Sequence, residues 1–116
     1  DEVRQYCWRL VEHVYIRGVS GGEPTPADYL NHAFEPNLVW HLGFYFAGQD
    51  IAPGDELFVD YRHLAQPEAP NPLIDTATGR PIEGLEWRRS LLAGCRELTR
   101  ALEASLERES ERERDA

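Results

Sequence analysis

The sequence predicts a mostly β protein that ends in a single α-helix. Residues 5–61 contain several short runs of aromatic and β-branched residues, the types enriched in strands, separated by turn residues. Residues 65–84 are rich in proline and glycine, which indicates an extended arm on the surface. From residue 85 onwards, apolar residues recur every three or four positions, the spacing of an amphipathic helix. We therefore expect strands within residues 1–64, an arm at 65–84 and a helix with a charged tail at 85–116.

Four or five short strands are expected in the first part of the chain. Val11–Ile16 is predicted to be one strand, because apolar residues lie on both of its faces. The glycine-rich residues 18–25 then form a loop. Leu38–His41 and Phe44–Ala47 are two apolar runs on either side of Leu42–Gly43, which indicates a hairpin.

A turn and a last strand follow the hairpin. Pro53–Gly54 favours a type II turn, because proline presets φ at the first central position and glycine accepts a positive φ at the second. Glu56–Tyr61 is predicted to be the next strand.

The helix is predicted from one apolar stripe with charge pairs on the outside. The stripe consists of Leu91, Cys95, Leu98, Leu102 and Leu106. It can dock on the domain itself or on a second copy of the chain, and docking on the domain is the commoner outcome for a single amphipathic helix. Residues 107–116 are expected to fray in solvent.

Length and charge limit the classes of function. A chain of 116 residues is the size of one domain, since most domains have roughly 100–150 residues. The net charge is −9, from 21 acidic and 12 basic residues. This balance argues against nucleic acid as a partner, because phosphates require a basic surface. It suits a basic, lysine-containing protein or peptide, or serves solubility alone.

The cysteines, histidines and hydropathy indicate the setting. Cys7 and Cys95 have the spacing of neither a zinc site nor a disulfide framework, which favours a reducing, cytoplasmic compartment. His13, His41 and His63 have no metal-like spacing, so no metal is expected. No apolar run reaches transmembrane length, and no membrane association is expected. Since residue 1 is not Met, we expect further residues upstream.

Two motifs in order resemble the signature of the SET domain family. That signature reads N-H-S-C-x-P-N and then A-x-x-D-I-x-x-G-E-E-L-x-x-D-Y. The matching residues here are Asn31, His32, Pro36 and Asn37, followed by Ala47, Asp50, Ile51, Gly54, Glu56, Leu57, Asp60 and Tyr61. The resemblance covers residues 6–63 and implies a SET-type arrangement of short strands with a knot-like crossing. Pro36 and Asn37 are expected to set up the turn into the hairpin.

The resemblance implies a protein-lysine methyltransferase that uses S-adenosyl-L-methionine. By this likeness Tyr61 is the catalytic residue, whose hydroxyl orients the lysine amine. Tyr29, Asn31 and His32 would hold the cofactor, and Trp87 is the candidate aromatic that closes the site. The structural alternatives are a strand-closing Tyr61, a turn cap made by Asn31 and a core anchor made by Trp87.

Val59, two residues before Tyr61, occupies the position that limits the number of methyl groups in several relatives. Its small side chain predicts di- or trimethylation. The site would lie in a narrow apolar channel, where desolvation and the positive sulfonium lower the pKa of the lysine.

The sequence also departs from the family pattern. Ala33 and Phe34 replace the usual Ser and Cys, and Asp28 stands where many relatives carry Arg. The family's N-terminal G-x-G segment is absent, and no cysteine cluster follows Tyr61 to bind zinc. A second hypothesis is therefore a catalytically inactive SET-like interaction module, in which the altered motif and the helix serve a partner.

Overall fold

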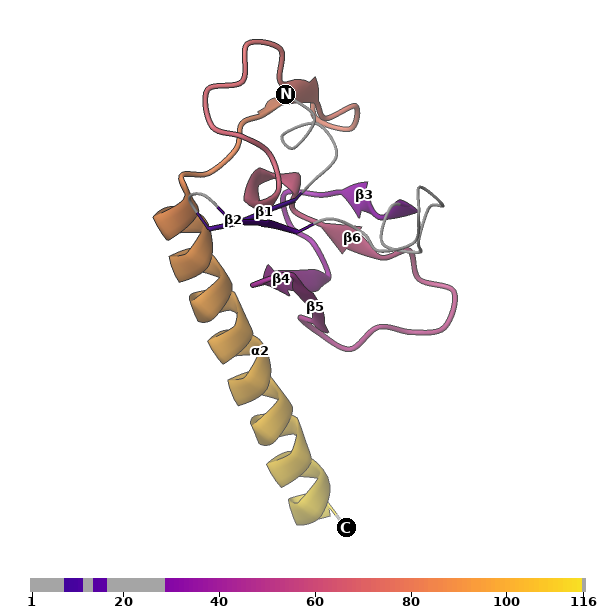
Figure 1. The fold of residues 1–116 in the computed structure, drawn as a ribbon. Helices are drawn as coiled ribbons and strands as arrows, with labels where there is room; N and C mark the ends of the chain where they lie inside the picture. The colour runs from indigo at the N-terminus through magenta and orange to yellow at the C-terminus, as the bar shows by residue number, and fades with distance from the viewer. Residues whose placement is uncertain (1–7, 12–13, 17–28, 116) are drawn as a thin grey trace.

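The computed structural model describes residues 8–11, 14–16 and 29–115, and places small two-stranded sheets beside one long helix (Figure 1). The helix extends past the strands, so that the molecule measures 56 Å along its longest axis and 30 Å across. In the described ranges no helix is long and apolar enough to cross a membrane.

The first sheet corrects the prediction of a single strand at residues 11–16. β1 (Trp8–Val11) and β2 (Val14–Ile16) pair antiparallel, with Trp8 opposite Ile16 and Val11 opposite Val14. Only two residues separate the two strands, which is the loop length of a tight hairpin, so the two halves of the apolar run can pair with each other. The predicted loop at residues 18–25 lies outside the described residues.

The hairpin predicted around Leu42–Gly43 is confirmed. β4 (Leu38–His41) and β5 (Phe44–Ala47) pair antiparallel. Leu42 and Gly43 have φ values of 51° and 84°, and positive φ at both central residues is the geometry of the tight turns that match strand twist. β4 supplies most of the described core: Leu38, Val39 and Trp40 are 8%, 5% and 3% exposed.

The second sheet joins segments that are far apart in the sequence. β3 (Asn31–His32) pairs parallel with β6 (Phe58–Val59), with Asn31 beside Phe58 and His32 beside Val59. The predicted turn before β6 is confirmed, since Gly54 has a φ of 90° and the amide of Asp55 donates to the carbonyl of Ala52 at 3.1 Å.

The strand predicted at Glu56–Tyr61 is too long. Only the two residues of β6 are extended, and the 3-10 helix η2 (Tyr61–His63) follows at once. Asp60 ends the strand because its carboxylate caps η2, accepting from the amide of Arg62 at 3.0 Å.

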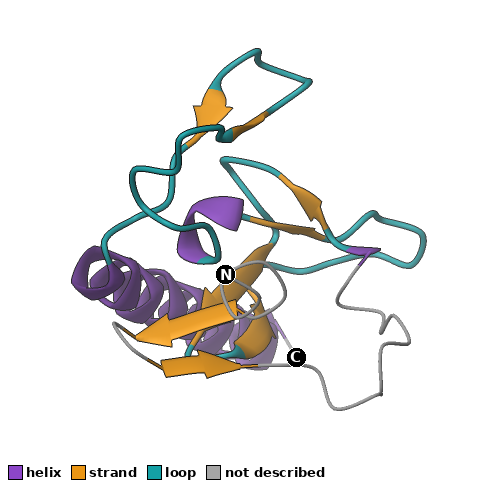
Figure 2. Cartoon of the chain, turned by 45° about the horizontal axis from the view of Figure 1, so that its top comes forward, coloured by secondary structure: helices purple, strands orange, loops and turns teal. Residues whose placement is uncertain are grey.

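The arm at residues 65–84 contains a hairpin that the sequence did not predict. β7 (Leu73–Ile74) pairs antiparallel with β8 (Pro81–Ile82), and Gly79 in the connecting turn has a φ of 73°. Ile82 is 4% exposed, so this hairpin adds to the core. Figure 2 shows it standing away from the long helix, with η2 between them.

The C-terminal helix α2 (Trp87–Asp115) is present but differs from the prediction at its end and on its face. It continues through the segment expected to fray. Its buried residues are Ser90 and Gly94, whereas Leu102 and Leu106 of the predicted stripe are 58% and 64% exposed.

The backbone of α2 approaches β4 closely. A Cβ atom at Gly94 would lie 2.5 Å from Nδ1 of His41 and 3.1 Å from the carbonyl oxygen of Trp40. Glycine is therefore required here for the helix to pack at this distance. With 29 residues in α2 and two to four in each described strand, the chain mixes α and β structure, and the expectation of a mostly β protein was only partly right.

Candidate functional site

The parallel pairing of β3 with β6 brings His32 and Tyr61 together. Because His32 lies beside Val59 in the sheet, the chain that turns into η2 passes directly over the histidine ring. The amide of Tyr61 donates to Nδ1 of His32 at 2.9 Å, and the two ring centroids are 5.2 Å apart. The amide of Ala33 closes the same junction by donating to the carbonyl of Val59 at 3.2 Å.

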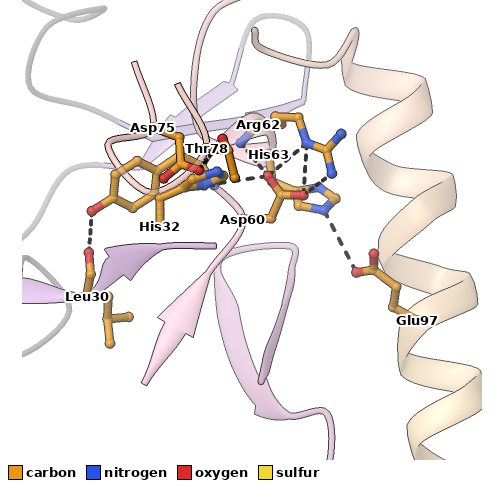
Figure 3. Close-up of polar contacts among 9 residues, drawn as sticks. Leu30, His32, Asp60, Arg62, His63, Asp75, Thr78 and Glu97 are labelled. Atoms are coloured by element: carbon orange, nitrogen blue, oxygen red, sulfur yellow. Dashed lines mark hydrogen bonds and ion pairs between the residues drawn. The ribbon is translucent and has the colours of Figure 1, made fainter. Parts of the chain in front are cut away.

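The phenol of Tyr61 points to the chain that enters β3. Its hydroxyl donates a hydrogen bond to the carbonyl of Leu30 (Figure 3 shows this carbonyl). Burial raises the pKa of Tyr61 above its usual value, so the hydroxyl remains protonated at neutral pH. The arrangement therefore holds a protonated phenol oxygen and a carbonyl oxygen side by side, and it suits orientation of a positively charged or amine group better than removal of a proton.

His32 is held in its neutral form with one defined tautomer. Its side chain is 4% exposed, and burial lowers its pKa, which the carboxylates of Asp60 and Asp75 partly oppose and Arg62 reinforces. Since Nδ1 accepts the amide of Tyr61, the proton of the neutral ring is on Nε2. Among the described residues, this buried Nε2 has no hydrogen-bond partner.

The carboxylate of Asp60 joins η2 to the site (Figure 3). It lies 3.9 Å from Nδ1 of His32 and binds the side chain of Arg62 through Nε at 3.0 Å and Nη2 at 2.5 Å. The hydrogen bond with Asp60 raises the pKa of Arg62, so the guanidinium keeps its charge. The aspartate is 5% exposed, and a buried carboxylate needs such a partner.

The other predicted site residues lie around this pair rather than in it. Asn31 is exposed, with its amide 3.5 Å from the carboxylate of Glu56. Tyr29 is 71% exposed. Val59 is 1% exposed and lies in the core beside His32.

Trp87 is the first residue of α2 and is half-buried. In the described part of the chain its ring contacts the guanidinium of Arg88, 5.9 Å from the ring centroid. The structure thus brings together Tyr61, His32 and Val59, and does not bring Trp87 into contact with Tyr61.

The sequence did not identify Asn37 as a clamp on β6. Its Nδ2 donates to the carbonyl of Glu56 and its Oδ1 accepts the amide of Phe58, both at 2.8 Å. Asn37 was expected only to set up the turn into the hairpin. The position of Asn37 in the P-N pair could have indicated this role, because the side chain of an asparagine next to a strand commonly forms hydrogen bonds with backbone groups.

Phe34, which departs from the motif, packs against the histidine. The rings of His32 and Phe34 are perpendicular, with centroids 4.4 Å apart. The guanidinium of Arg62 lies 4.9 Å from the Phe34 centroid, and that of Arg80 lies 4.2 Å away. Both distances are in the range of cation–π contacts.

His63 connects the Tyr61 turn to α2. Its Nδ1 lies 2.7 Å from Oγ of Ser90, and its Nε2 lies 3.9 Å from the carboxylate of Glu97 (Figure 3). Its ring stacks on Trp40, with centroids 6.0 Å apart. Burial raises the pKa of Glu97, an effect that Asp60 strengthens and nearby arginines oppose.

No group of three His, Cys, Asp or Glu side chains that could hold a metal occurs among the described residues.

The comparisons with known proteins identify the family. The model of the SET domain family matches residues 4–62, half of the chain. The search of curated proteins and the search of solved structures found no match. Members of the SET family are in general protein-lysine methyltransferases. The matched range contains β3, β6 and the residues of the junction between His32 and Tyr61, and this chain belongs to the SET domain family.

Proposed function

We propose that the protein is an S-adenosyl-L-methionine-dependent protein-lysine N-methyltransferase. The observation that carries the proposal is the hydrogen bond from the Tyr61 hydroxyl to the carbonyl of Leu30, held in place by the pairing of β3 with β6. Two segments far apart in the sequence are needed to form it, and a strand-closing tyrosine would not require that contact.

The residues of the site fit the chemistry of the cofactor. S-adenosyl-L-methionine supplies a methyl group on a positively charged sulfur. The oxygens of Tyr61 and Leu30 form an electron-rich pair that can attract such a methyl group through weak C–H···O contacts. The exposed amide of Asn31 and the Nε2–H of His32, which has no partner among the described residues, are polar groups with capacity for a ligand. Tyr29 and Trp87 remain our candidates for aromatic contacts with the cofactor.

Tyr61 acts by positioning. Its raised pKa keeps the hydroxyl as a donor that can also accept through its lone pairs, so it can hold the lysine nitrogen in line with the methyl group. Alignment of two reactants is worth roughly 7–11 kcal/mol in favourable cases. The neighbouring histidine is neutral, and therefore adds no charge that would repel a cationic substrate.

The substrate is proposed to be a basic, lysine-containing protein or peptide in the cytoplasm. The net charge of −9 favours its approach electrostatically. Val59 is proposed to face the substrate channel, where its small side chain permits di- or trimethylation. Mass spectra of a lysine peptide that show only the monomethyl product would contradict this role for Val59.

The experiment is a pair of measurements on wild type and Tyr61→Phe. Calorimetric titration with S-adenosyl-L-methionine measures cofactor affinity, and transfer of labelled methyl groups to a lysine-rich peptide measures turnover. We expect Tyr61→Phe to lower turnover about 100-fold, the order of a lost positioning group, and to change cofactor affinity less than threefold. Tyr45→Phe, the same substitution on β5, is the control. Equal losses of affinity and turnover in Tyr61→Phe would contradict the assigned role.

The second candidate is an inactive SET-like interaction module. The exposed leucines of α2 favour it: Leu92, Leu102 and Leu106 are 50%, 58% and 64% exposed. Absence of cofactor binding at millimolar concentration would favour this module over the enzyme.

A further inference from the structure

The face of the β7–β8 hairpin that carries Asp75 and Arg80 is turned towards the site. These residues follow the last ladder pair, Ile74 opposite Pro81, and the amide of Asp75 donates to the carbonyl of Arg80 at 2.8 Å. Side chains of directly opposite residues project from the same face of a ribbon. On that face, the guanidinium of Arg80 lies 4.2 Å from the centroid of Phe34.

The two opposite charges are held apart. Asp75 is tied to its own turn, since its Oδ2 accepts the hydroxyl of Thr78 at 2.6 Å, and this bond lowers the pKa of Asp75. The guanidinium of Arg80 lies over Phe34 instead. Within the described ranges the structure shows no ion pair between Asp75 and Arg80. A carboxylate has about four lone-pair sites, so Asp75 has capacity for a further donor.

His32 supplies a third group on the same side. Its Nδ1 faces the amide of Tyr61 and the carboxylate of Asp60, so Nε2, on the far edge of the ring, faces away from Asp60. Figure 3 draws Asp75 near this ring, and the charge of Asp75 acts on His32. The side chain is 4% exposed and Nε2 is without a partner in the described part of the chain. Folded proteins rarely leave a buried donor unpaired, which indicates a missing acceptor.

The ring of Phe34 lies 4.4 Å from that of His32 and 4.2 Å from the guanidinium of Arg80, and the charge of Asp75 acts on His32. A carboxylate, a guanidinium and a ring N–H that lie this near to one another match the groups that bind an α-amino-acid group. We propose that Asp75, Arg80 and the Nε2–H of His32 form a subsite for such a group. Its ammonium binds Asp75, and its carboxylate binds Arg80 and Nε2–H, each through a charge-assisted hydrogen bond. The assignment rests on the proposed function, because S-adenosyl-L-methionine carries this group at its methionine end. The hairpin of the arm then covers the methionine end of the cofactor.

Calorimetric titrations of the full chain with three probes test the subsite. S-adenosylhomocysteine carries the amino-acid group, methylthioadenosine lacks it, and L-methionine carries it without the nucleoside. We expect S-adenosylhomocysteine to bind at least tenfold more tightly than methylthioadenosine. Asp75→Asn and Arg80→Gln should each weaken S-adenosylhomocysteine about tenfold and leave methylthioadenosine unchanged.

Controls separate the subsite from general charge effects and from folding. Glu111→Gln and Arg112→Gln make the same changes at exposed positions near the end of α2 and should leave all three affinities unchanged. Asp75→Asn keeps an oxygen for Thr78, so the turn is retained, and unchanged thermal unfolding checks this.

The outcomes distinguish failure of the subsite from failure of the proposed function. Equal affinity of the wild type for S-adenosylhomocysteine and methylthioadenosine overturns the subsite and leaves the methyltransferase proposal standing, as does a variant that weakens both equally. Binding of L-methionine alone, lost in Asp75→Asn and Arg80→Gln, supports the subsite while removing the methyl donor as its ligand. Absence of binding by all three probes overturns both.

Discussion

Replacement of Asn37 by alanine tests how the site is held together. The Asn37 amide makes two hydrogen bonds of 2.8 Å to the backbone of the segment that becomes β6, one to the carbonyl of Glu56 and one from the amide of Phe58. Asn37→Ala removes both. The register of β6 beside β3 then depends only on the two-residue pairing of these strands. That pairing places Tyr61 over His32.

The expected loss of stability follows from the two bonds. A hydrogen bond of this kind contributes about 0.5–1.5 kcal/mol net, so the pair is worth about 2 kcal/mol. For a domain whose total free energy of unfolding is about 5–15 kcal/mol, this is a large share. With a urea dependence of about 2 kcal/mol per molar, the unfolding midpoint should fall by about 1 M. The slope should stay constant. Binding of the proposed cofactor should weaken as well, because the geometry of the site depends on β6.

Two further variants make the Asn37 test specific. Asn71→Ala removes the same side chain from an exposed position in the arm and should shift the midpoint very little. Asn37→Asp keeps an oxygen for the amide of Phe58 but places a negative charge next to the carbonyl of Glu56, so it should be at least as harmful as alanine. A midpoint for Asn37→Ala within about 0.2 M of wild type would refute the clamp.

Three other variants test separate features. His32 has a folded-state pKa below 6.5, so the unfolded chain binds its proton more readily than the folded chain. The free energy of unfolding should therefore fall as the pH drops below about 6.5. His32→Asn, which keeps an acceptor for the Tyr61 amide, should flatten this part of the pH profile of stability, measured by urea titration. Gly94→Ala gains about 1 kcal/mol of helix propensity but places a Cβ atom 2.5 Å from Nδ1 of His41, and such overpacking costs about 1–3 kcal/mol. Thermal unfolding should therefore show a net loss of stability. An unchanged or higher unfolding temperature would mean that the helix lies further from β4. Gly84→Ala would place a Cβ atom 2.2 Å from the carbonyl oxygen of Ala65, a backbone atom that cannot rotate away, and a variant that unfolds at the wild-type temperature would contradict this close approach.

Local patterns in the sequence were sufficient to predict three of the elements. The hairpin formed by β4 and β5 follows from two apolar runs around Leu42–Gly43, and the turn before β6 follows from Pro53–Gly54. The start of α2 follows from the helical spacing of its leucines. In each of these, the residues that form the element are neighbours in the chain.

The site itself has no local pattern. β3 and β6 have two residues each, too few to show alternation, and each strand's partner is distant in the chain. Only the likeness to a known family indicated that Asn31–His32 and Tyr61 belong to one site. The β7–β8 hairpin was missed for the same reason, since Leu73–Ile74 and Pro81–Ile82 are equally short.

The end of α2 could not be predicted from its apolar stripe. The helix continues to Asp115 beyond the last leucine, because charged residues at helical spacing support a helix without burial. A contact with the β5–β6 loop adds to this, since Nε of Arg108 lies 3.3 Å from the carboxylate of Asp50. Such an anchor becomes visible only when both segments are placed in space.

The three-residue turn η2 has neighbours of different kinds at its two ends. Tyr61 faces the carbonyl of Leu30, while His63 is bonded to Ser90 on the long helix. Because η2 has only three residues, a displacement of α2 that moves His63 is expected to move Tyr61 as well. A partner bound at the far end of α2 is therefore expected to shift the Tyr61 hydroxyl without contacting the proposed site.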